Sequence, residues 1–122
     1  MTQQTSDYQP WCIFCRIARG EATAEVLYQD DLVIAFRDIR PQAPIHVLVV
    51  PNRHIPAVAA VAVNDAELLG RLVTVANRLA EDEGVARSGY RLVINNGPQA
   101  GQSVNHLHLH LLAGRRLGWP PG

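Results

Sequence analysis

Histidine and leucine alternate from His106 to Leu111 in the segment NHLHLHLLA. Successive side chains of a β-strand point to opposite faces of a sheet, so this period of two predicts a strand over residues 105–113. On such a strand His106, His108 and His110 share one face, while the leucines enter the core. The segment therefore predicts a fold with a β-sheet that packs its leucine face against a hydrophobic core and carries imidazole rings on the opposite face.

Other parts of the chain have the patterns of further strands and two helices. Apolar residues at helical spacing, ended by Gly20, predict a short helix over residues 12–20. A second helix is expected from Asn64, which would cap it with Glu67 completing a capping box, to about Glu83. Apolar and β-branched runs predict strands over residues 25–30, 32–38, 45–51 and 90–95.

This order of elements predicts an α+β domain with a mainly antiparallel sheet of about five strands. We expect the helices to cover one face and to leave the other face, or one end of the sheet, to a ligand. A chain of 122 residues with 48% hydrophobic residues can bury one core but is too short for two ordinary domains. Residues 1–10 are expected to form a flexible tail and residues 11–122 a single domain.

The charge balance and the apolar runs exclude several classes of partner. The formal net charge is zero, so we expect no basic face that binds extended nucleic acid. All eleven basic residues are arginines, which excludes Schiff-base lysine chemistry and a Walker-type phosphate loop. Residues 1–10 do not resemble a secretory signal, and the apolar run at 55–63 is far shorter than the roughly 20 residues that span a bilayer. We therefore expect a soluble cytoplasmic protein with no membrane partner.

The two cysteines, Cys12 and Cys15, form one C-x-x-C motif. In a reducing compartment this spacing indicates a metal or redox site rather than a disulfide framework. The sequence WCIFC resembles the thioredoxin active site, but a strand precedes that motif in thioredoxin and only eleven residues precede Cys12 here. Zinc is favoured, because structural zinc sites commonly combine two thiolates with two histidines.

The three alternating histidines cannot all bind one ion. Neighbouring Cα atoms on a strand are about 6.5 to 7 Å apart at this spacing, and the outer two about 13 to 14 Å. Two neighbours with a remote ligand could still form a zinc site, and the simplest alternative is a half-exposed strand with polar outward positions. The adjoining loop NNGPQAGQS has small and amide residues that could receive an anion. Because neutral imidazole is nucleophilic near neutral pH, the combination indicates phosphate chemistry.

Two separated motifs, DIRPQAPIHVLVVPNRHI and GQSVNHLHLHLLAGRRLGWPPG, resemble those of the histidine triad (HIT) nucleotide-binding proteins. The resemblance extends from about Trp11 to Gly122, and the WPPG ending is similar to that of the phosphoramidase branch. It implies a HIT-like fold in a homodimer that extends the sheet. It also implies a purine nucleotide-binding hydrolase that cleaves the bond between a nucleoside 5'-monophosphate and an amine, typically in an adenosine phosphoramidate.

The resemblance also implies catalytic roles. His108 would attack the α-phosphorus and form a nucleotidyl-histidine, which water cleaves to release the monophosphate. His110 would hold an α-phosphate oxygen, and the amides around Gly101, Gln102 and Ser103 would spread the growing charge. Ser103 could also pass a proton to the leaving nitrogen. His46 would be the fourth histidine, which orients the triad or shares a proton with it, or has only a structural role.

Binding residues follow from the same resemblance. Asn95 would lie near the phosphate and ribose, and Asp38 would accept hydrogen bonds from the ribose hydroxyls. The apolar residues of the base pocket, each of which alone indicates ordinary core, would be Ile13, Phe14, Ile17, Phe36 and Ile39. Trp119 in the C-terminal tail would either lie near the partner's active site and help select the leaving group, or pack on its own domain.

A structural zinc ion is implied by relatives that have C-x-F-C near the start. Its ligands here would be Cys12, Cys15, His54 and His106, and zinc on His106 would remove that ring from proton transfer. The alternative is two buried free cysteines and a surface His54.

Other functions stay open at this point. The first is a dinucleoside polyphosphate hydrolase or nucleotidyl transferase with the same His108 intermediate. The second is a non-catalytic, zinc-stabilised nucleotide sensor or partner-binding module.

Overall fold

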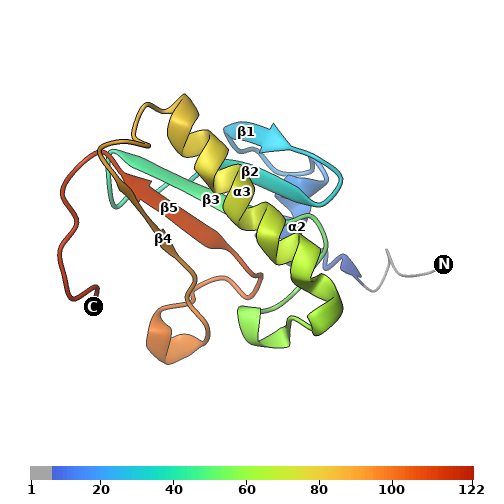
Figure 1. The fold of residues 1–122 in the computed structure, drawn as a ribbon. Helices are drawn as coiled ribbons and strands as arrows, with labels where there is room; N and C mark the ends of the chain where they lie inside the picture. Colours follow the sequence, from blue (N-terminus) through green and yellow to red (C-terminus); the bar gives the residue numbers. More distant parts are fainter. Residues whose placement is uncertain (1–6) are drawn as a thin grey trace.

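The computed structural model describes residues 7–122, which form one five-stranded antiparallel sheet with the strand order β1-β2-β3-β5-β4 (Figure 1). The strands are β1 (Val26–Gln29), β2 (Val33–Arg37), β3 (Ile45–Pro51), β4 (Tyr90–Val93) and β5 (Leu109–Ala113). The helices are α2 (Ile13–Ala18) and α3 (Ala66–Asp82), with short 3-10 turns η1 (Val58–Ala60), η2 (Val63–Asp65) and η3 (Pro98–Ala100). The predicted α+β fold with an antiparallel five-stranded sheet and two helices is confirmed.

The two helices lie on opposite faces of the sheet, so the expectation that both cover one face is wrong. Helix α3 crosses one face (Figure 1), where Leu72 belongs to the same core cluster as Val47 and Leu111. Helix α2 lies on the other face, where Phe14 belongs to a second cluster with Leu48. The reason is visible in β2 and β3, which are almost continuously apolar and buried, and such strands need cover on both faces.

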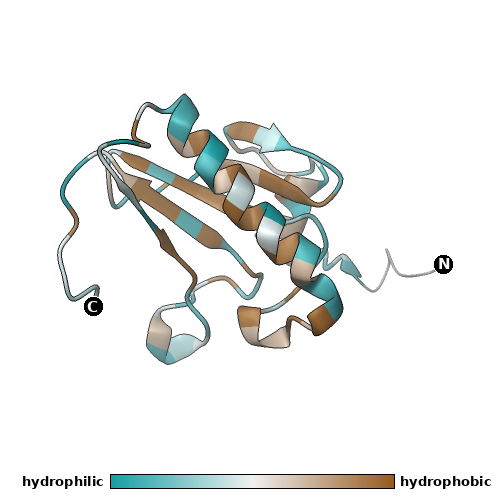
Figure 2. Ribbon diagram, in the orientation of Figure 1, coloured by the Kyte–Doolittle hydropathy of each residue, from teal (hydrophilic) through white to brown (hydrophobic). Residues whose placement is uncertain are grey.

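Hydropathy follows this two-sided arrangement. Figure 2 shows the central strands in mostly hydrophobic colours and α3 with both hydrophilic and hydrophobic residues. The buried residues of α3 recur at helical spacing, at Leu68, Leu72, Val75, Ala76, Leu79 and Ala80. Neither described helix is long and apolar enough to cross a membrane.

The N-terminus of α3 also differs from the sequence prediction. The helix begins at Ala66, after a 3-10 turn, and Asn64 makes no hydrogen bond to it within residues 7–122. Asp65 stabilises the turn instead, because its carboxylate accepts a hydrogen bond from the amide of Ala62 at 2.9 Å and pairs with Arg53. The predicted Asn64 cap is therefore wrong, while the predicted C-terminus near Glu83, followed by Gly84 with φ +77°, agrees with the structure.

Strand β5 is shorter than predicted and starts at Leu109 rather than Asn105. It pairs with β3 only as far as Val49, and the chain bends after Pro51. Two residues before β5, the amide of Leu107 donates a hydrogen bond to the carbonyl of Ile55, which lies beyond the end of β3, at 2.7 Å. The alternation nevertheless persists through the irregular residues, because Leu107 is buried in the α3 core.

The pairing of β3 with β5 places histidines together on the face away from α3. His110 is directly opposite Leu48, and His46 lies two residues before Leu48 on the same face. Helix α2 packs on that face through Leu48 and Val50 of β3. A histidine-bearing region of the sheet therefore adjoins α2.

Candidate functional site

The five histidines form two groups that meet at neighbouring residues of one segment. His46, His108 and His110 form the first group, in which the rings of His46 and His110 have centroids 5.2 Å apart and those of His108 and His110 5.0 Å apart. His54 and His106 form the second, with centroids 5.1 Å apart. His106 and His108 both lie in the irregular chain before β5, and they belong to different groups.

His108 has a defined tautomer. Its Nδ1 lies 2.7 Å from the main-chain carbonyl oxygen of His106. A carbonyl oxygen only accepts, so Nδ1 carries the proton and Nε2 of the neutral ring keeps its lone pair. The ring is 5% exposed and is packed edge-on against Phe14, with centroids 5.3 Å apart. His108 therefore has a free basic nitrogen in a fixed orientation, as a nucleophile requires.

A second chain of hydrogen bonds fixes the proton of His110. The amide of Gln42 donates to Nδ1 of His46 at 3.0 Å, so the proton of neutral His46 is on Nε2. That Nε2 lies 2.9 Å from Nδ1 of His110 and donates to it. The remaining nitrogen of His110, Nε2, must then carry a proton. It is buried and has no hydrogen-bond partner within residues 7–122.

Burial keeps this histidine pair neutral. It lowers the pKa of His110 to about 4, and the nearby His108 and His46 lower it further. Burial also lowers the pKa of His46, although the carboxylate of Asp38 opposes that shift. Since a buried donor without a partner is destabilising, the His110 Nε2–H is suited to an acceptor from a ligand, such as a phosphate oxygen.

Asp38 lies beside this group. One carboxylate oxygen is 3.4 Å from Nε2 of His46, and the other accepts a hydrogen bond from the amide of Arg40 at 2.8 Å. The structure thus brings Asp38 beside His46, in the group that also contains His108 and His110. Asn95, half-buried after β4, makes no hydrogen bond in the described part of the chain. The roles of both side chains toward ribose stay predictions.

The loop before the histidines differs from the expected phosphate cradle. The amide of Gly101 donates to the carbonyl of Pro98, and the amide of Gln102 donates to that of Gly97, both at 3.1 Å. These two amides close the loop on itself and are not free for a phosphate. Ser103 is exposed, and neither its amide nor its hydroxyl forms a hydrogen bond within residues 7–122. Of the three predicted amides, only that of Ser103 is available.

The residues predicted to form a base pocket divide into two sets. Phe14, Ile17 and Phe36 are buried in the cluster under α2. Ile39 is 87% exposed and Ile13 is 41% exposed. The first set therefore forms a common apolar support, whereas Ile13 and Ile39 are accessible at the surface, where a flat apolar ligand could contact them.

Two cysteines and two histidines meet beside Phe14, whose ring centroid is 5.8 Å from that of His106. Nδ1 of His106 is 3.4 Å from Sγ of Cys12 and 3.6 Å from Sγ of Cys15, while Nδ1 of His54 is 3.4 Å from Sγ of Cys15. All four donor atoms lie within 4.8 Å of one another. The C-x-x-C spacing achieves this because Cys12 caps α2 and Cys15 lies one turn later, with its amide directed at the Cys12 sulfur.

This donor set fits a tetrahedral zinc ion. At normal zinc bond lengths, a sulfur and a nitrogen ligand are about 3.5 Å apart. Nε2 of His106 donates to the carbonyl of Pro51 at 2.9 Å, which leaves the Nδ1 lone pair directed at the sulfurs. Burial raises the pKa of Cys15 to about 11 and lowers that of His106 to about 4. A buried cation is the partner that would stabilise thiolates in such surroundings.

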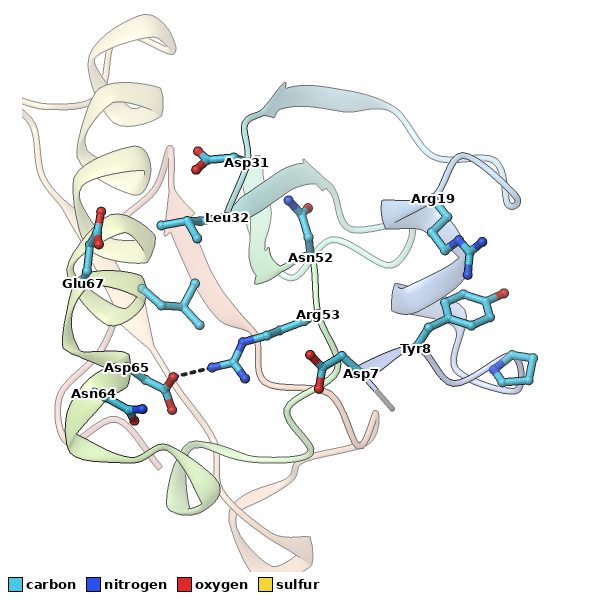
Figure 3. A pocket seen from close by; sticks show the side chains of 12 residues that line it. Asp7, Tyr8, Arg19, Asp31, Leu32, Asn52, Arg53, Asn64, Asp65 and Glu67 are labelled. Atoms are coloured by element: carbon cyan, nitrogen blue, oxygen red, sulfur yellow. Dashed lines mark hydrogen bonds and ion pairs between the residues drawn. The ribbon is translucent and has the colours of Figure 1, made fainter. Parts of the chain in front are cut away.

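An open cavity of about 920 Å³ adjoins the second group, since its lining residue Asp7 accepts a hydrogen bond from the amide of His54. Figure 3 shows that Arg53 extends across it to Asp65, with Asp7 and Tyr8 on one side and Glu67 on the other. Its lining contains no histidine or cysteine. Despite its volume, this cavity lacks the nucleophile and the metal ligands that make up the candidate site.

Comparison with known proteins decides the family. Residues 19–117 match the HIT domain. The chain belongs to the HIT domain family. It is 53% identical over 106 residues to the purine nucleoside phosphoramidase of Escherichia coli (strain K12), with 87% of this chain and 89% of that protein covered. The predicted resemblance to histidine triad proteins is confirmed.

Solved structures of other HIT proteins agree with this fold. A HIT family hydrolase from Legionella pneumophila matches with a TM-score of 0.89 and 50% identity, covering 91% of this chain and 99% of that one. A zinc-bound histidine triad family protein from Mycobacterium smegmatis matches with a TM-score of 0.75 and 32% identity, covering 92% and 80%.

Sequence reasoning missed the main-chain groups that orient the HIT histidines. These are the carbonyls of Pro51 and His106 and the amide of Gln42. Any residue supplies such groups, so residue identity gives no sign of them. A partial signal was the PQAP turn before His46, because a turn four residues upstream can direct an amide back at the ring.

Proposed function

We propose that this HIT family protein is a purine nucleoside phosphoramidase that hydrolyses the P–N bond of adenosine 5'-phosphoramidates. The observation that carries the proposal is the pair of tautomers at neighbouring positions. His108 presents an unprotonated Nε2, and His110 presents a buried, unpartnered Nε2–H. A nucleophile beside a hydrogen-bond donor is the arrangement that phosphoryl transfer needs. The 53% identity to a purine nucleoside phosphoramidase supports the same substrate class.

In the first step, Nε2 of His108 forms a bond to the α-phosphorus while the P–N bond breaks. The amine leaves with a proton, and Ser103 is the proposed group that passes it from solvent. His110 donates its Nε2–H to a phosphoryl oxygen and stabilises the charge that develops there. The His106 carbonyl, 2.7 Å from Nδ1 of His108, stabilises the cationic ring of the nucleotidyl-histidine.

In the second step, water attacks the phosphorus and gives up a proton to solvent, and the bond to His108 breaks. The imidazole recovers its lone pair, and the nucleoside monophosphate is released. The sum of the two steps adds one water molecule across the P–N bond and yields a monophosphate and an amine. His46 keeps His110 in the donor tautomer through both steps, because its Nε2–H occupies Nδ1 of His110.

The nucleoside is placed by residues around this centre. Asp38 accepts from the ribose hydroxyls with the carboxylate that adjoins His46, and Asn95 contacts the phosphate or ribose. The base is proposed to contact the exposed side chains of Ile13 and Ile39, while Phe14, Ile17 and Phe36 belong to the buried cluster under α2.

We further propose a structural zinc ion on Cys12, Cys15, His54 and His106. Bound zinc would cross-link α2, the segment after β3 and the segment before β5, and four protein ligands would leave no open position for water. The compatible donor distances and the zinc-bound Mycobacterium smegmatis relative support this assignment. Two metal-binding thiols suit a reducing compartment, so we place the protein in the cytoplasm.

A homodimer is proposed through strand β4. It is the last strand in the sheet order, and its outer edge is unpaired within residues 7–122. Pairing two such edges would extend the sheet and cover exposed main-chain groups. Trp119, which is 82% exposed, is then available to contact the partner's leaving-group site. Light scattering after size-exclusion chromatography tests the dimer, and a monomer at micromolar concentration contradicts it.

A substrate panel tests the function. We expect rapid release of adenosine monophosphate from an adenosine 5'-phosphoramidate, slow turnover of diadenosine polyphosphates, and loss of activity in His108→Ala. Faster cleavage of the polyphosphates would instead favour another HIT branch. Nucleotide binding without turnover of either substrate would identify a sensor.

A further inference from the structure

The side chain of Gln102 is fully engaged inside the loop that precedes the catalytic histidines. Its Oε1 accepts a hydrogen bond from the amide of Gly97 at 2.8 Å. Its Nε2 donates both protons, to the carbonyl of Pro56 at 2.8 Å and to that of Val104 at 3.0 Å. With both protons used, this amide has no donor left for a substrate.

These bonds close the loop around Ser103. The main-chain amide of Gln102 donates to the carbonyl of Gly97, so the two residues exchange a pair of hydrogen bonds. Val104, on the other side of Ser103, is held by the same side chain. Gly101 has φ +89°, a left-handed conformation that suits glycine and lets the chain reverse within so few residues. Ser103 is thus fixed through both of its neighbours although it makes no hydrogen bond of its own in the described chain.

A second contact ties the same loop to the segment after β3. The Oδ1 of Asn96 accepts from the amide of Ala59 at 2.8 Å, and Pro56 accepts from Gln102. A little further along, the amide of Leu107 donates to the carbonyl of Ile55. Residues 96–107 therefore form three hydrogen bonds with residues 55–59, and the bond from Gln102 is the nearest of the three to Ser103 in sequence.

We propose that Gln102 is a positioning residue of the phosphoramidase reaction, whose side-chain amide holds the Gly97–Val104 loop and thereby places Ser103. The inference rests on the proposed function. It replaces the expectation that Gln102 itself contacts the phosphate. Small displacements of a reacting group strongly slow a reaction, so a misplacement of about 1 Å is expected to lower the rate by roughly 100-fold.

Gln102→Glu tests this role with little change of shape. The introduced carboxylate can still accept from Gly97, but at pH 8 it has no proton for the carbonyls of Pro56 and Val104. We expect kcat to fall about 10- to 100-fold at pH 8, with a smaller change in KM. The ratio to the wild type should recover toward pH 5, as the carboxyl gains a proton that it can donate. Gln102→Met, which keeps the length but cannot donate, should show the loss without recovery.

Gln99→Glu is the matched control, because Gln99 is an exposed residue of the same loop and its side chain makes no hydrogen bond within residues 7–122. It introduces the same charge and should retain wild-type kcat and the wild-type pH profile. Thermal unfolding midpoints of all variants show whether each one is folded.

A double-mutant cycle links Gln102 to Ser103. If Gln102 acts by placing Ser103, the double variant Gln102→Glu/Ser103→Ala should be about as slow as Ser103→Ala alone. Losses that multiply would overturn the role, as would wild-type kcat in Gln102→Glu at pH 8. If the wild type hydrolyses no phosphoramidate, the proposed function and this role both fail. If the wild type is active and the losses multiply, only the role of Gln102 fails.

Discussion

The main-chain carbonyl of His106 accepts the Nδ1–H of His108 at 2.7 Å. One residue thereby serves both groups of side chains. The imidazole of His106 faces the cysteines, and its carbonyl orients the ring of His108. In the proposed mechanism the three alternating histidines consequently have separate tasks, in which His106 supports, His108 attacks and His110 donates.

Removal of the His110 donor should slow the reaction without unfolding the protein. We expect His110→Ala to lower kcat roughly 100- to 1,000-fold, because a donor directed at developing charge is worth about that much in rate. Steady-state kinetics measure the loss, and circular dichroism controls for folding. A kcat within threefold of the wild type would contradict the role of the buried Nε2–H.

Acid should destabilise the protein through its buried histidines. The pKa of His110 is lowered to about 4 by burial, so the native ring stays neutral while the unfolded chain takes up a proton below about pH 6.5. The contribution of His110 to the free energy of unfolding is therefore complete above pH 6.5 and is lost as the pH falls toward 4. Urea unfolding at several pH values measures the slope. His110→Asn should have a shallower pH dependence, and an unchanged slope would argue against a buried neutral ring.

Zinc removal should affect stability before it affects turnover. The four ligands connect three segments of the chain, so a chelator is expected to lower the thermal midpoint by about 10 °C, the equivalent of roughly 3 kcal/mol for a domain of this size. Metal analysis should give one zinc per chain, and Cys15→Ser should reduce it. If chelation abolished turnover at the same concentration at which it lowered the midpoint, the division between a structural and a catalytic group would be wrong.

Gly114 should resist substitution because of its position after β5. Its φ is +95°, and a Cβ at this position would lie 2.8 Å from Cβ of Pro44. Gly114→Ala is expected to lower the free energy of unfolding by about 2 kcal/mol through backbone strain and this clash. Gly118→Ala is the control, since nothing lies within 4 Å of the added carbon. Equal stabilities of the two variants would contradict the account.

The side chains with chemical functions could be predicted because their spacing is local or forms a recognisable motif. The alternation from His106 to His110 and the C-x-x-C of Cys12 and Cys15 are of this kind, and the structure brings each set to its predicted neighbours. The chain order also predicted the antiparallel sheet. The continuous apolar runs of β2 and β3 indicate burial on both faces, which is the signal that places α2 opposite α3.

The rest depended on main-chain geometry that residue types do not encode. Phosphate binding by the amides of Gly101 and Gln102 looked reasonable from composition, yet both amides close their own loop. The Asn64 cap failed because a 3-10 turn precedes α3, and the carboxylate of Asp65 caps that turn by accepting a hydrogen bond from the amide of Ala62. The early start predicted for β5 failed because the segment leaves β3 before Leu109. In the same register Leu107 would lie opposite Pro51, but its amide donates to the carbonyl of Ile55 instead.

The most direct test of the central claim is the site of the covalent intermediate. An adenosine phosphoramidate should be mixed with the enzyme and quenched within milliseconds with an alkaline denaturant, because acid cleaves the P–N bond of a nucleotidyl-histidine. The protein should then be digested at alkaline pH and analysed by mass spectrometry. We predict an adenylyl group on His108, present in His110→Ala as well and absent from His108→Ala. An adduct on another residue, or turnover that persists in His108→Ala at the wild-type rate, would contradict nucleophilic attack by His108.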